Sequence, residues 1–333
     1  MQVNFTVNRL GDGRIPSSMD GVRFVQDEEH VLYDSNLEDL KRQLAAGEQP
    51  ARFELAGPRA RIYFDPSKLK CGIVTCGGLC PGLNDVIRSI VFSLHYHYGV
   101  KTVFGFPYGY EGLVPKYRHT PIELTPQSVG PIHEMGGTIL GTSRGPQDPA
   151  EVVDTLERMN VGVLFAIGGD GTLRGARDLA VEIGRRGLKI AIVAVPKTID
   201  NDISFTEKSF GFETAVSEAR RSTYAAHSEA SAARNGIGLV KLMGRESGFI
   251  AAFAVLADSQ VNFCLVPEVP FSLDLFLEAL ERRLQQRGHA VIVASEGAGQ
   301  DLMQVPPEVD ASGNRKLGDI GLFLKDRILT YFR

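Results

Sequence analysis

Short apolar runs alternate with amphipathic segments along most of the chain from residue 70 onward. Each apolar run is short enough to be a buried strand, and these runs cover residues 70–75, 100–106, 161–167, 190–195, 240–243, 264–266 and 290–294. The segments between them place apolar side chains on one helical face, as Val86, Ile87, Ile90, Val91 and Leu94 do. Further helices are predicted over 171–184, 213–227, 247–257, 273–287 and 319–332. Strand, loop and helix in this order predict an α/β fold built on parallel sheets.

The first 68 residues show no such alternation. They are rich in charge, proline and glycine, and only one short helix is predicted, over residues 37–46. We interpret residues 1–68 as an N-terminal arm that precedes the α/β region.

Two loops at predicted strand ends contain glycines in a pattern that suits phosphate binding. Gly77 and Gly78 follow the strand at 70–75 and precede a helix, so backbone N–H groups and the helix N-terminus face an anion site. No Gly-Lys-Ser/Thr follows, so this is not a P-loop, and an ordinary tight turn is the alternative. Residues 168–172 read Gly-Gly-Asp-Gly-Thr. There Gly171 leaves room for a phosphate, Asp170 is a candidate Mg²⁺ ligand, and Thr172 is expected to begin and cap a helix.

A third loop carries acidic chemistry. Residues 196–202 read Pro-Lys-Thr-Ile-Asp-Asn-Asp and place Asp200 and Asp202 directly after a strand. One carboxylate is a candidate base for a hydroxyl proton and the other a metal or water ligand, while an Asx-rich turn is the alternative. Transfer of a phosphoryl group also needs cations, and Arg144 and Arg245 both lie in loops flanked by glycine.

Composition narrows the function classes. The chain has 333 residues, 43% of them hydrophobic and 23% charged, and a net charge of −4. This argues against nucleic acid or a membrane surface as the main partner. No apolar run reaches the roughly 18 residues of a membrane span, and the first residues lack a signal-peptide pattern, so a cytoplasmic location is expected. Four cysteines, three of them close together, are interpreted as reduced thiols and not as a metal site.

Taken together, the loops resemble those of the phosphofructokinase family, from about residue 70 to 333. The matching motifs are Gly77-Gly78 with Pro81-Gly82-Leu83-Asn84, Gly109-Tyr110-Glu111-Gly112-Leu113, Gly141-Thr142-Ser143-Arg144, 168–172, 196–202, Met243-Gly244-Arg245 and Glu296. The arm segment 53–59 resembles the branch found in plants, trypanosomatids and some bacteria. The resemblance implies two three-layer α/β domains with mostly parallel sheets. A donor-binding domain would span 69–211, and a sugar-phosphate-binding domain 212–333.

The resemblance also implies roles for individual residues. Asp200 would be the general base toward the 1-hydroxyl of fructose 6-phosphate, with Arg144 and Thr198 as further catalytic residues. Mg²⁺ would be held by Asp170, with support from Asp202. The residues implied to bind the donor are Gly77, Gly78, Tyr110, Arg144, Gly145, Gly169, Asp170, Gly171, Thr172 and Lys197. Those implied to bind the sugar phosphate are Thr198, Ile199, Asp200, Met243, Gly244, Arg245 and Glu296. The product would be fructose 1,6-bisphosphate, and a homo-oligomer, dimer or tetramer, is implied.

The donor depends on two positions. Pyrophosphate-using members carry Asp where Gly171 stands and Lys where Lys197 stands, whereas the short bacterial ATP enzymes carry Gly at both. An Asp side chain would crowd and repel an α-phosphate, so Gly171 favours ATP, and the mixed pair resembles the plant and trypanosomatid ATP enzymes. Pyrophosphate as donor is the alternative. Nucleotide or lipid kinases with a similar glycine loop, and a catalytically impaired fragment or regulatory homologue, are more distant alternatives.

Two features depart from the family pattern. Short bacterial enzymes have an Arg nine residues before the Arg of Met-Gly-Arg, and this chain has Gly236 there. Family members also continue beyond the position of Arg333, so the resemblance implies that the second domain is incomplete at its C-terminus. We therefore expect weak sugar-phosphate affinity if the chain ends there.

Overall fold

The computed structural model describes residues 5–304, 308–309 and 315–333, which form two compact units. The first unit contains the residues up to Cys76 together with Asn84–Ile167 and Thr172–Val195. The second contains Gly77–Leu83, Gly168–Gly171 and the chain from Pro196 onward. The two glycine loops thus group with the C-terminal half of the sequence.

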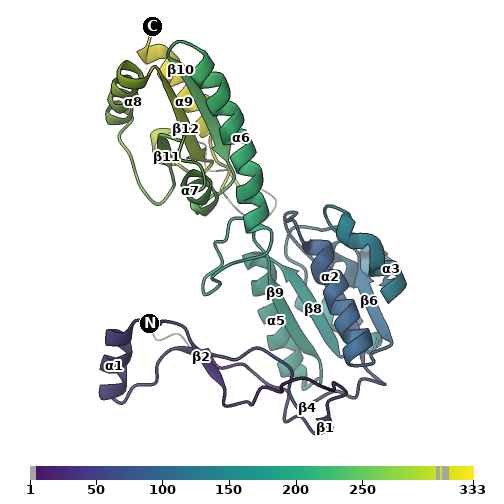
Figure 1. The fold of residues 1–333 in the computed structure, drawn as a ribbon. Helices are drawn as coiled ribbons and strands as arrows, with labels where there is room; N and C mark the ends of the chain where they lie inside the picture. Colours follow the sequence, from purple (N-terminus) through teal and green to yellow (C-terminus); the bar gives the residue numbers. More distant parts are fainter. Residues whose placement is uncertain (1–4, 305–307, 310–314) are drawn as a thin grey trace. The chain divides into compact units, whose positions relative to one another are not determined.

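A five-stranded sheet organises the first unit (Figure 1). Its strands lie in the order β7-β6-β5-β8-β9. Their bounds are β5 Lys70–Thr75, β6 Thr102–Phe106, β7 Ile122–Glu123, β8 Val163–Gly168 and β9 Ala191–Pro196. The central strand β5 pairs in parallel with both β6 and β8, and the short edge strand β7 runs antiparallel to β6. The strands predicted from apolar runs are therefore confirmed to within one or two residues.

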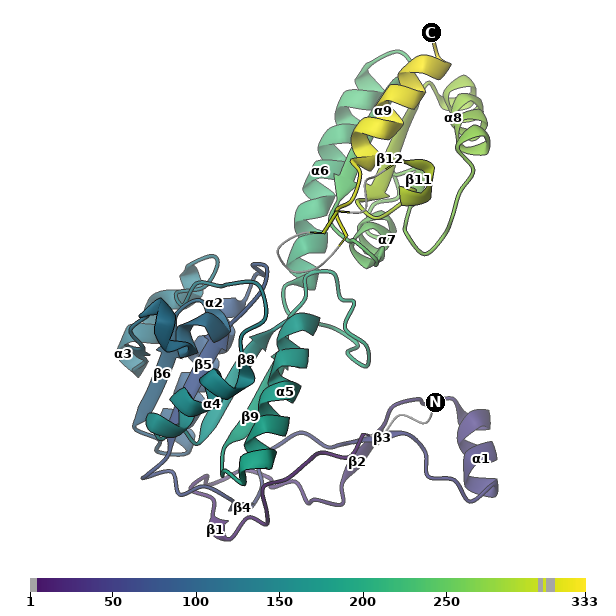
Figure 2. The same cartoon turned by 180° about the vertical axis from the view of Figure 1, so that it is seen from behind.

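Helices cover both faces of this sheet. Figure 1 shows α2 (Leu83–Phe92) and α3 (Pro126–Val129) in front of it, and Figure 2 shows α4 (Pro149–Arg158) and α5 (Asp170–Arg186) on the opposite face. Apolar side chains of α4 and α5, among them Leu156 and Leu179, pack on Phe106 and Leu164 of the sheet. This closely packed layer fixes the strands whose ends carry the candidate loops. A π-helical turn (Ser93–His97) continues α2, and 3-10 turns span Gly109–Leu113, Pro115–Tyr117 and Gly130–Glu134.

The N-terminal arm contains more structure than expected. Beside α1 (Leu37–Ala45) it forms two small antiparallel pairs. These join β1 (Ile15–Pro16) to β4 (Arg61–Ile62) and β2 (His30–Leu32) to β3 (Arg52–Glu54). The prediction of an irregular segment with one helix was incomplete, because pairings of two or three residues depend on partners distant in sequence.

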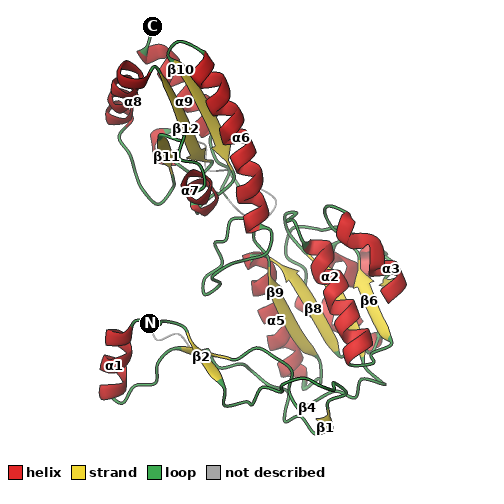
Figure 3. Ribbon diagram, in the orientation of Figure 1, coloured by secondary structure: helices red, strands yellow, loops and turns green. Residues whose placement is uncertain are grey.

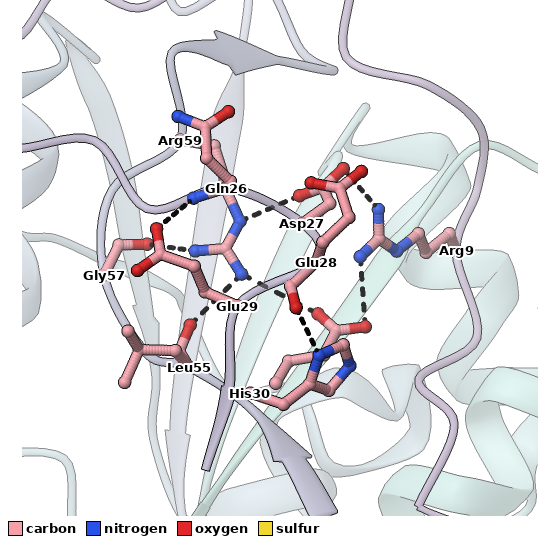
Figure 4. Close-up of polar contacts among 10 residues, drawn as sticks. Arg9, Gln26, Asp27, Glu28, Glu29, His30, Leu55, Gly57 and Arg59 are labelled. Atoms are coloured by element: carbon pink, nitrogen blue, oxygen red, sulfur yellow. Dashed lines mark hydrogen bonds and ion pairs between the residues drawn. The ribbon is translucent and has the colours of Figure 1, made fainter.

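Charged side chains join the segments of the arm (Figure 4). Asp27 accepts hydrogen bonds from Arg9 and Arg59, at 2.9 Å each. Arg59 also donates to the carbonyl oxygens of Gly57 and Leu55, at 3.1 Å each. These two guanidinium groups hold the pKa of Asp27 below its ordinary value.

A three-stranded parallel sheet organises the second unit (Figure 3). It has the order β10-β12-β11, with bounds β10 Gly236–Leu242, β11 Phe263–Leu265 and β12 His289–Ser295. Its helices are α6 (Phe212–Ala232), α7 (Phe249–Leu256), α8 (Leu273–Arg287) and α9 (Ile320–Tyr331), and a 3-10 turn spans Gln300–Leu302. Phe212 and Ala219 of α6 pack with Ile250 of α7, while α8 and α9 form a separate core with the strands. The fold class, α/β with parallel sheets between helical layers, is confirmed.

Several helices differ from the prediction. The helix after the glycine loop begins at Asp170, so Thr172 is a buried residue inside its first turn, and its predicted role as the first, capping residue was wrong. Helix α4 was missed, although Asp148 caps it and Pro149 opens it in the arrangement that marks a helix start. Within the described residues, no helix is long and apolar enough to span a membrane.

Candidate active site

The acidic loop follows β9 and is held by its own polar side chains. The backbone N–H of Asp200 donates to Thr198 Oγ1 (3.1 Å), and that hydroxyl donates to Asp202 Oδ1 (2.6 Å). Asn201 adopts a left-handed conformation (φ 56°), which Asn tolerates better than most residues. Its side chain accepts from the backbone N–H of Ser209 (2.8 Å) and donates to the Glu207 carbonyl (3.0 Å). The loop therefore has one defined shape around Asp200.

Asp200 occupies an electrostatically unfavourable place. Its Oδ1 is buried and has no hydrogen-bond partner among the described residues. Burial raises its pKa from 3.8 to about 6, and the nearby carboxylates of Asp202 and Glu296 contribute to the rise. Arg245 and Lys197 oppose it. A buried carboxyl with a pKa near neutrality is a candidate general base, because it can both accept and release a proton at physiological pH.

Lys197 connects the acidic loop to both glycine loops. It is almost fully buried, with 6% of its surface exposed. Its backbone N–H donates to the Gly168 carbonyl (2.9 Å), and its Nζ donates to the Gly78 carbonyl (2.8 Å). The structure therefore brings these three predicted loops together in the second unit through one residue, whose backbone bonds one glycine loop and whose side chain bonds the other.

The loop at residues 168–171 leaves open space where a donor was expected. A Cβ atom built on Gly171 would have no heavy atom within 4 Å, whereas one on Gly169 would lie 3.4 Å from the Lys197 carbonyl. Asp170 is exposed at the first position of α5. An anion is favoured at such a helix start, and the absence of a side chain at residue 171 keeps the approach open.

The loop predicted to bind the sugar phosphate is tightly folded. Gly244 has φ 120°, a conformation that favours glycine, and a Cβ there would lie 2.2 Å from the Ser247 carbonyl. A Cβ on Gly297 would lie 1.7 Å from the carbonyl of Arg245. Glycine is therefore required at both positions, and the segment that carries Glu296 lies directly against the Met243–Arg245 turn.

The side chains of this turn differ in their surroundings. Met243 is half exposed, and Arg245 Nη2 donates to the Arg315 carbonyl (2.5 Å). The electrostatic effect of Arg245 on Asp200 indicates that both residues belong to one charged cluster of the second unit. Ile199, also predicted to contact the sugar phosphate, is partly buried and packs against the core formed by α6 and α7, and its predicted role stays a prediction.

Four predicted residues belong to the first unit, Tyr110, Arg144, Gly145 and Thr172. Tyr110 donates its hydroxyl to the Thr172 carbonyl (2.9 Å), and burial raises its pKa above the ordinary value. Arg144 and Gly145 are exposed in the loop after Gly141. The hydroxyl of the adjacent Ser143 donates to the Tyr108 carbonyl (2.6 Å). The ligand-binding roles predicted for these four residues stay predictions, as does the assignment of donor binding to 69–211 and of sugar-phosphate binding to 212–333.

The donor set suits Mg²⁺ that is shared with a bound phosphate. No group of three or more His, Cys, Asp or Glu side chains able to hold a metal occurs among the residues that the structure describes. Asp170 and Asp202 are both exposed carboxylates, and Mg²⁺ commonly takes only one or two protein carboxylates beside substrate phosphates and water. The two residues therefore fit a metal that arrives with the donor.

Three buried serines of this region were not predicted. They are Ser209, Ser247 and Ser295, with exposed fractions of 5%, 4% and 0%. Each donates its hydroxyl to a backbone carbonyl of a candidate loop, at Thr198, Asp200 and Gly244 respectively. Only Ser247 carried a sequence signal, because it lies two residues after Arg245.

Comparison with known proteins agrees with this geometry. Residues 70–328 match the family model described as phosphofructokinase. An ATP-dependent 6-phosphofructokinase of Trypanosoma cruzi is 51% identical over 306 residues, which cover 92% of this chain and 63% of the relative. An enzyme of the same name from Borreliella burgdorferi is 53% identical over 290 residues, covering 84% of this chain and 65% of the relative. The chain thus spans somewhat less than two thirds of these relatives.

Solved structures share the fold at lower identity. A phosphofructokinase from Saccharomyces cerevisiae superposes with a TM-score of 0.63 at 24% identity, covering 79% of this chain and 37% of the other. A pyrophosphate-dependent phosphofructokinase from Marinobacter aquaeolei gives a TM-score of 0.61 at 23% identity, covering 69% and 61%. At these identities the likeness concerns the fold alone.

Proposed function

The chain belongs to the phosphofructokinase family, and we propose that it transfers the terminal phosphoryl group of ATP to the 1-hydroxyl of fructose 6-phosphate. The observation that carries this proposal is Asp200, a partly buried carboxyl with a pKa of about 6 whose Oδ1 has no hydrogen-bond partner among the described residues. The names of the relatives, ATP-dependent 6-phosphofructokinases, support the choice of donor and acceptor.

Asp200 is the base in this proposal. Its carboxylate takes the proton of the sugar 1-hydroxyl while that oxygen bonds to the terminal phosphorus of ATP, and the bond from phosphorus to the bridging oxygen breaks. ADP leaves with the bond electrons, and fructose 1,6-bisphosphate forms. A base with a pKa near 6 is ionised at neutral pH and still basic enough to accept the proton in the transition state.

Asp170 and Asp202 would hold Mg²⁺, which when bound neutralises charge on the donor phosphates. The exposed backbone at Gly171 gives phosphate oxygens close access to N–H groups at the start of α5. Arg245 and Glu296 provide polar contacts for the sugar phosphate, and Arg144 contacts the donor phosphates.

Pyrophosphate is the second candidate donor, and Lys197 is the observation that favours it, because pyrophosphate-using members carry Lys there. We favour ATP, because the Lys197 Nζ donates to the Gly78 carbonyl and because no side chain at residue 171 blocks an α-phosphate. A homo-oligomer in the cytoplasm is part of the proposal.

Turnover measured with fructose 6-phosphate and each donor in turn tests the proposal. We expect kcat/KM to be higher with ATP-Mg²⁺ than with pyrophosphate-Mg²⁺. We also expect Asp200→Asn to lower kcat sharply with little change in KM. A higher kcat/KM with pyrophosphate would refute the choice of donor, and unchanged turnover in Asp200→Asn would remove the base.

A further inference from the structure

The hydroxyl of Ser247 bridges the loop that carries the base and the loop proposed to bind the sugar phosphate. Ser247 follows the Met243–Arg245 turn, and its Oγ donates to the backbone carbonyl of Asp200 at 3.0 Å. The two residues are 47 positions apart in the chain, and only 4% of the serine is exposed. The same oxygen accepts a longer contact from the N–H of Phe249, the first residue of α7 (3.5 Å).

Ser295 anchors the same turn from the other side. It is fully buried at the end of β12, and its Oγ donates to the Gly244 carbonyl (2.5 Å). The N–H of Gly297 donates to that carbonyl as well (3.0 Å). The turn is therefore fixed to the rigid end of a central strand by Ser295 and to the base loop by Ser247.

Two anchors confine the backbone of Asp200. Its N–H is bonded to Thr198 Oγ1 within the loop, and its carbonyl is bonded to Ser247 from outside the loop. Among the described residues, no hydrogen bond orients the Asp200 carboxylate at Oδ1, so the position of its backbone determines where this oxygen lies. Ser247 is the described side chain that ties this backbone to the turn carrying Arg245.

We propose that Ser247 is a positioning residue, which holds the Asp200 carboxylate in register with a sugar phosphate bound at the Met243–Arg245 turn. Ser295 has the complementary task of holding the turn itself. The inference rests on the proposed function, because it takes Asp200 as the base and the turn as a sugar-phosphate site. It predicts that loss of the two hydroxyls has separable kinetic effects, since a base displaced by about 1 Å loses rate without losing substrate affinity.

The test compares Ser247→Ala and Ser295→Ala with a matched control. Thr155→Val is suitable, because Thr155 is also buried (5% exposed), its Oγ1 donates to a backbone carbonyl (Glu151, 3.3 Å), and it lies in α4 of the first unit. We expect Ser247→Ala to lower kcat about 10-fold while KM for both substrates changes less than about 2-fold. Ser295→Ala should raise KM for fructose 6-phosphate more than it lowers kcat, and Thr155→Val should retain both constants.

The separate response of kcat and KM and a conservative variant provide readouts that general destabilisation would not change. Ser247→Thr keeps the hydroxyl and should keep kcat within about 3-fold of the unsubstituted protein. A kcat in Ser247→Thr as low as in Ser247→Ala would overturn the assignment to the hydroxyl.

Asp200→Asn separates this inference from the proposed function. If Asp200→Asn loses turnover but Ser247→Ala matches Thr155→Val in kcat and in both KM values, Ser247 has no positioning role and the proposed function stands. If Asp200→Asn retains turnover, the proposed base is wrong and the inference falls with it.

Discussion

Replacement of Asp200 by Asn should stabilise the protein while it abolishes turnover. The pKa of Asp200 is about 6 in the folded protein against an ordinary 3.8, so folding disfavours the ionised form. At about 1.4 kcal/mol per pKa unit, the difference corresponds to at most about 3 kcal/mol. The carboxyl is partly accessible to water, and solvent screening reduces the expected value to about 1–2 kcal/mol. Asn has nearly the same shape and no charge, so it removes this cost.

The direction of the pKa shift of Asp200 determines the pH range in which Asp200→Asn stabilises the protein. Because the folded pKa is raised, ionisation of Asp200 costs nothing below pH 3.8, where both states are protonated, and the cost grows as pH rises toward about 6. The free energy of unfolding of Asp200→Asn should therefore match that of the unsubstituted protein near pH 4. At pH 7–8 the free energy of unfolding of Asp200→Asn should exceed that of the unsubstituted protein by about 1–2 kcal/mol, and the difference should not grow further above pH 7.

Urea unfolding at several pH values measures this difference, with equal m-values as the check that both proteins unfold alike. Thr155→Val is the control, because loss of that hydroxyl should lower stability by a pH-independent amount. A stability difference for Asp200→Asn that is zero at pH 8, or that is largest near pH 4, would refute the electrostatic argument.

Four further predictions concern single positions. The profile of kcat/KM against pH should fall on the acidic side with an apparent pKa near 6 as Asp200 is protonated, and a limb below pH 5 would contradict this. Gly171→Asp should fold normally, since a Cβ there meets no atom within 4 Å, and should lower kcat/KM for ATP at least about 100-fold more than for pyrophosphate. Lys197→Met removes both the bond to the Gly78 carbonyl and a charge that lowers the pKa of Asp200, so kcat should fall and the acidic limb should move to higher pH. Asp27→Asn in the arm should lower the free energy of unfolding by no more than about 1 kcal/mol, with kcat unchanged, because exposed ion pairs contribute little.

The strands and most helices could be predicted because each is encoded locally. The run at residues 70–75 has a largely apolar middle and became β5 without a change of bounds, and the helix predicted over 273–287 became α8 with the same bounds. The strands of the arm could not be predicted in this way. β1 and β4 are two residues long, and their pairing of Ile15 with Ile62 spans 47 positions.

The sequence predicted the reactive residues of the candidate site, but not the residues whose hydrogen bonds hold its loops in place. Asp200 and Lys197 stand out because their residue types at a strand end suggest a reaction. Ser295 has no such signal, because its partner Gly244 is 51 residues away and a serine at the end of a buried strand is unremarkable in sequence. Lys197 was expected to contact the donor, and its bond to the Gly78 carbonyl adds a structural task that its position alone does not imply.

Hydrogen bonds that hold the loop carrying Asp200 explain how its carboxylate stays in a place where ionisation is unfavourable. Ionised Asp200 costs about 1–2 kcal/mol at neutral pH, and a loop free to move would turn the carboxylate toward water. Hydrogen bonds from Ser247, Ser209 and Asn201 oppose that motion. At about 1 kcal/mol each, three such bonds outweigh the electrostatic cost. Loss of one of these bonds leaves the stabilisation from the remaining two close to the cost of ionised Asp200. A single hydroxyl such as that of Ser247 is therefore enough to alter the position of the base while the rest of the fold persists.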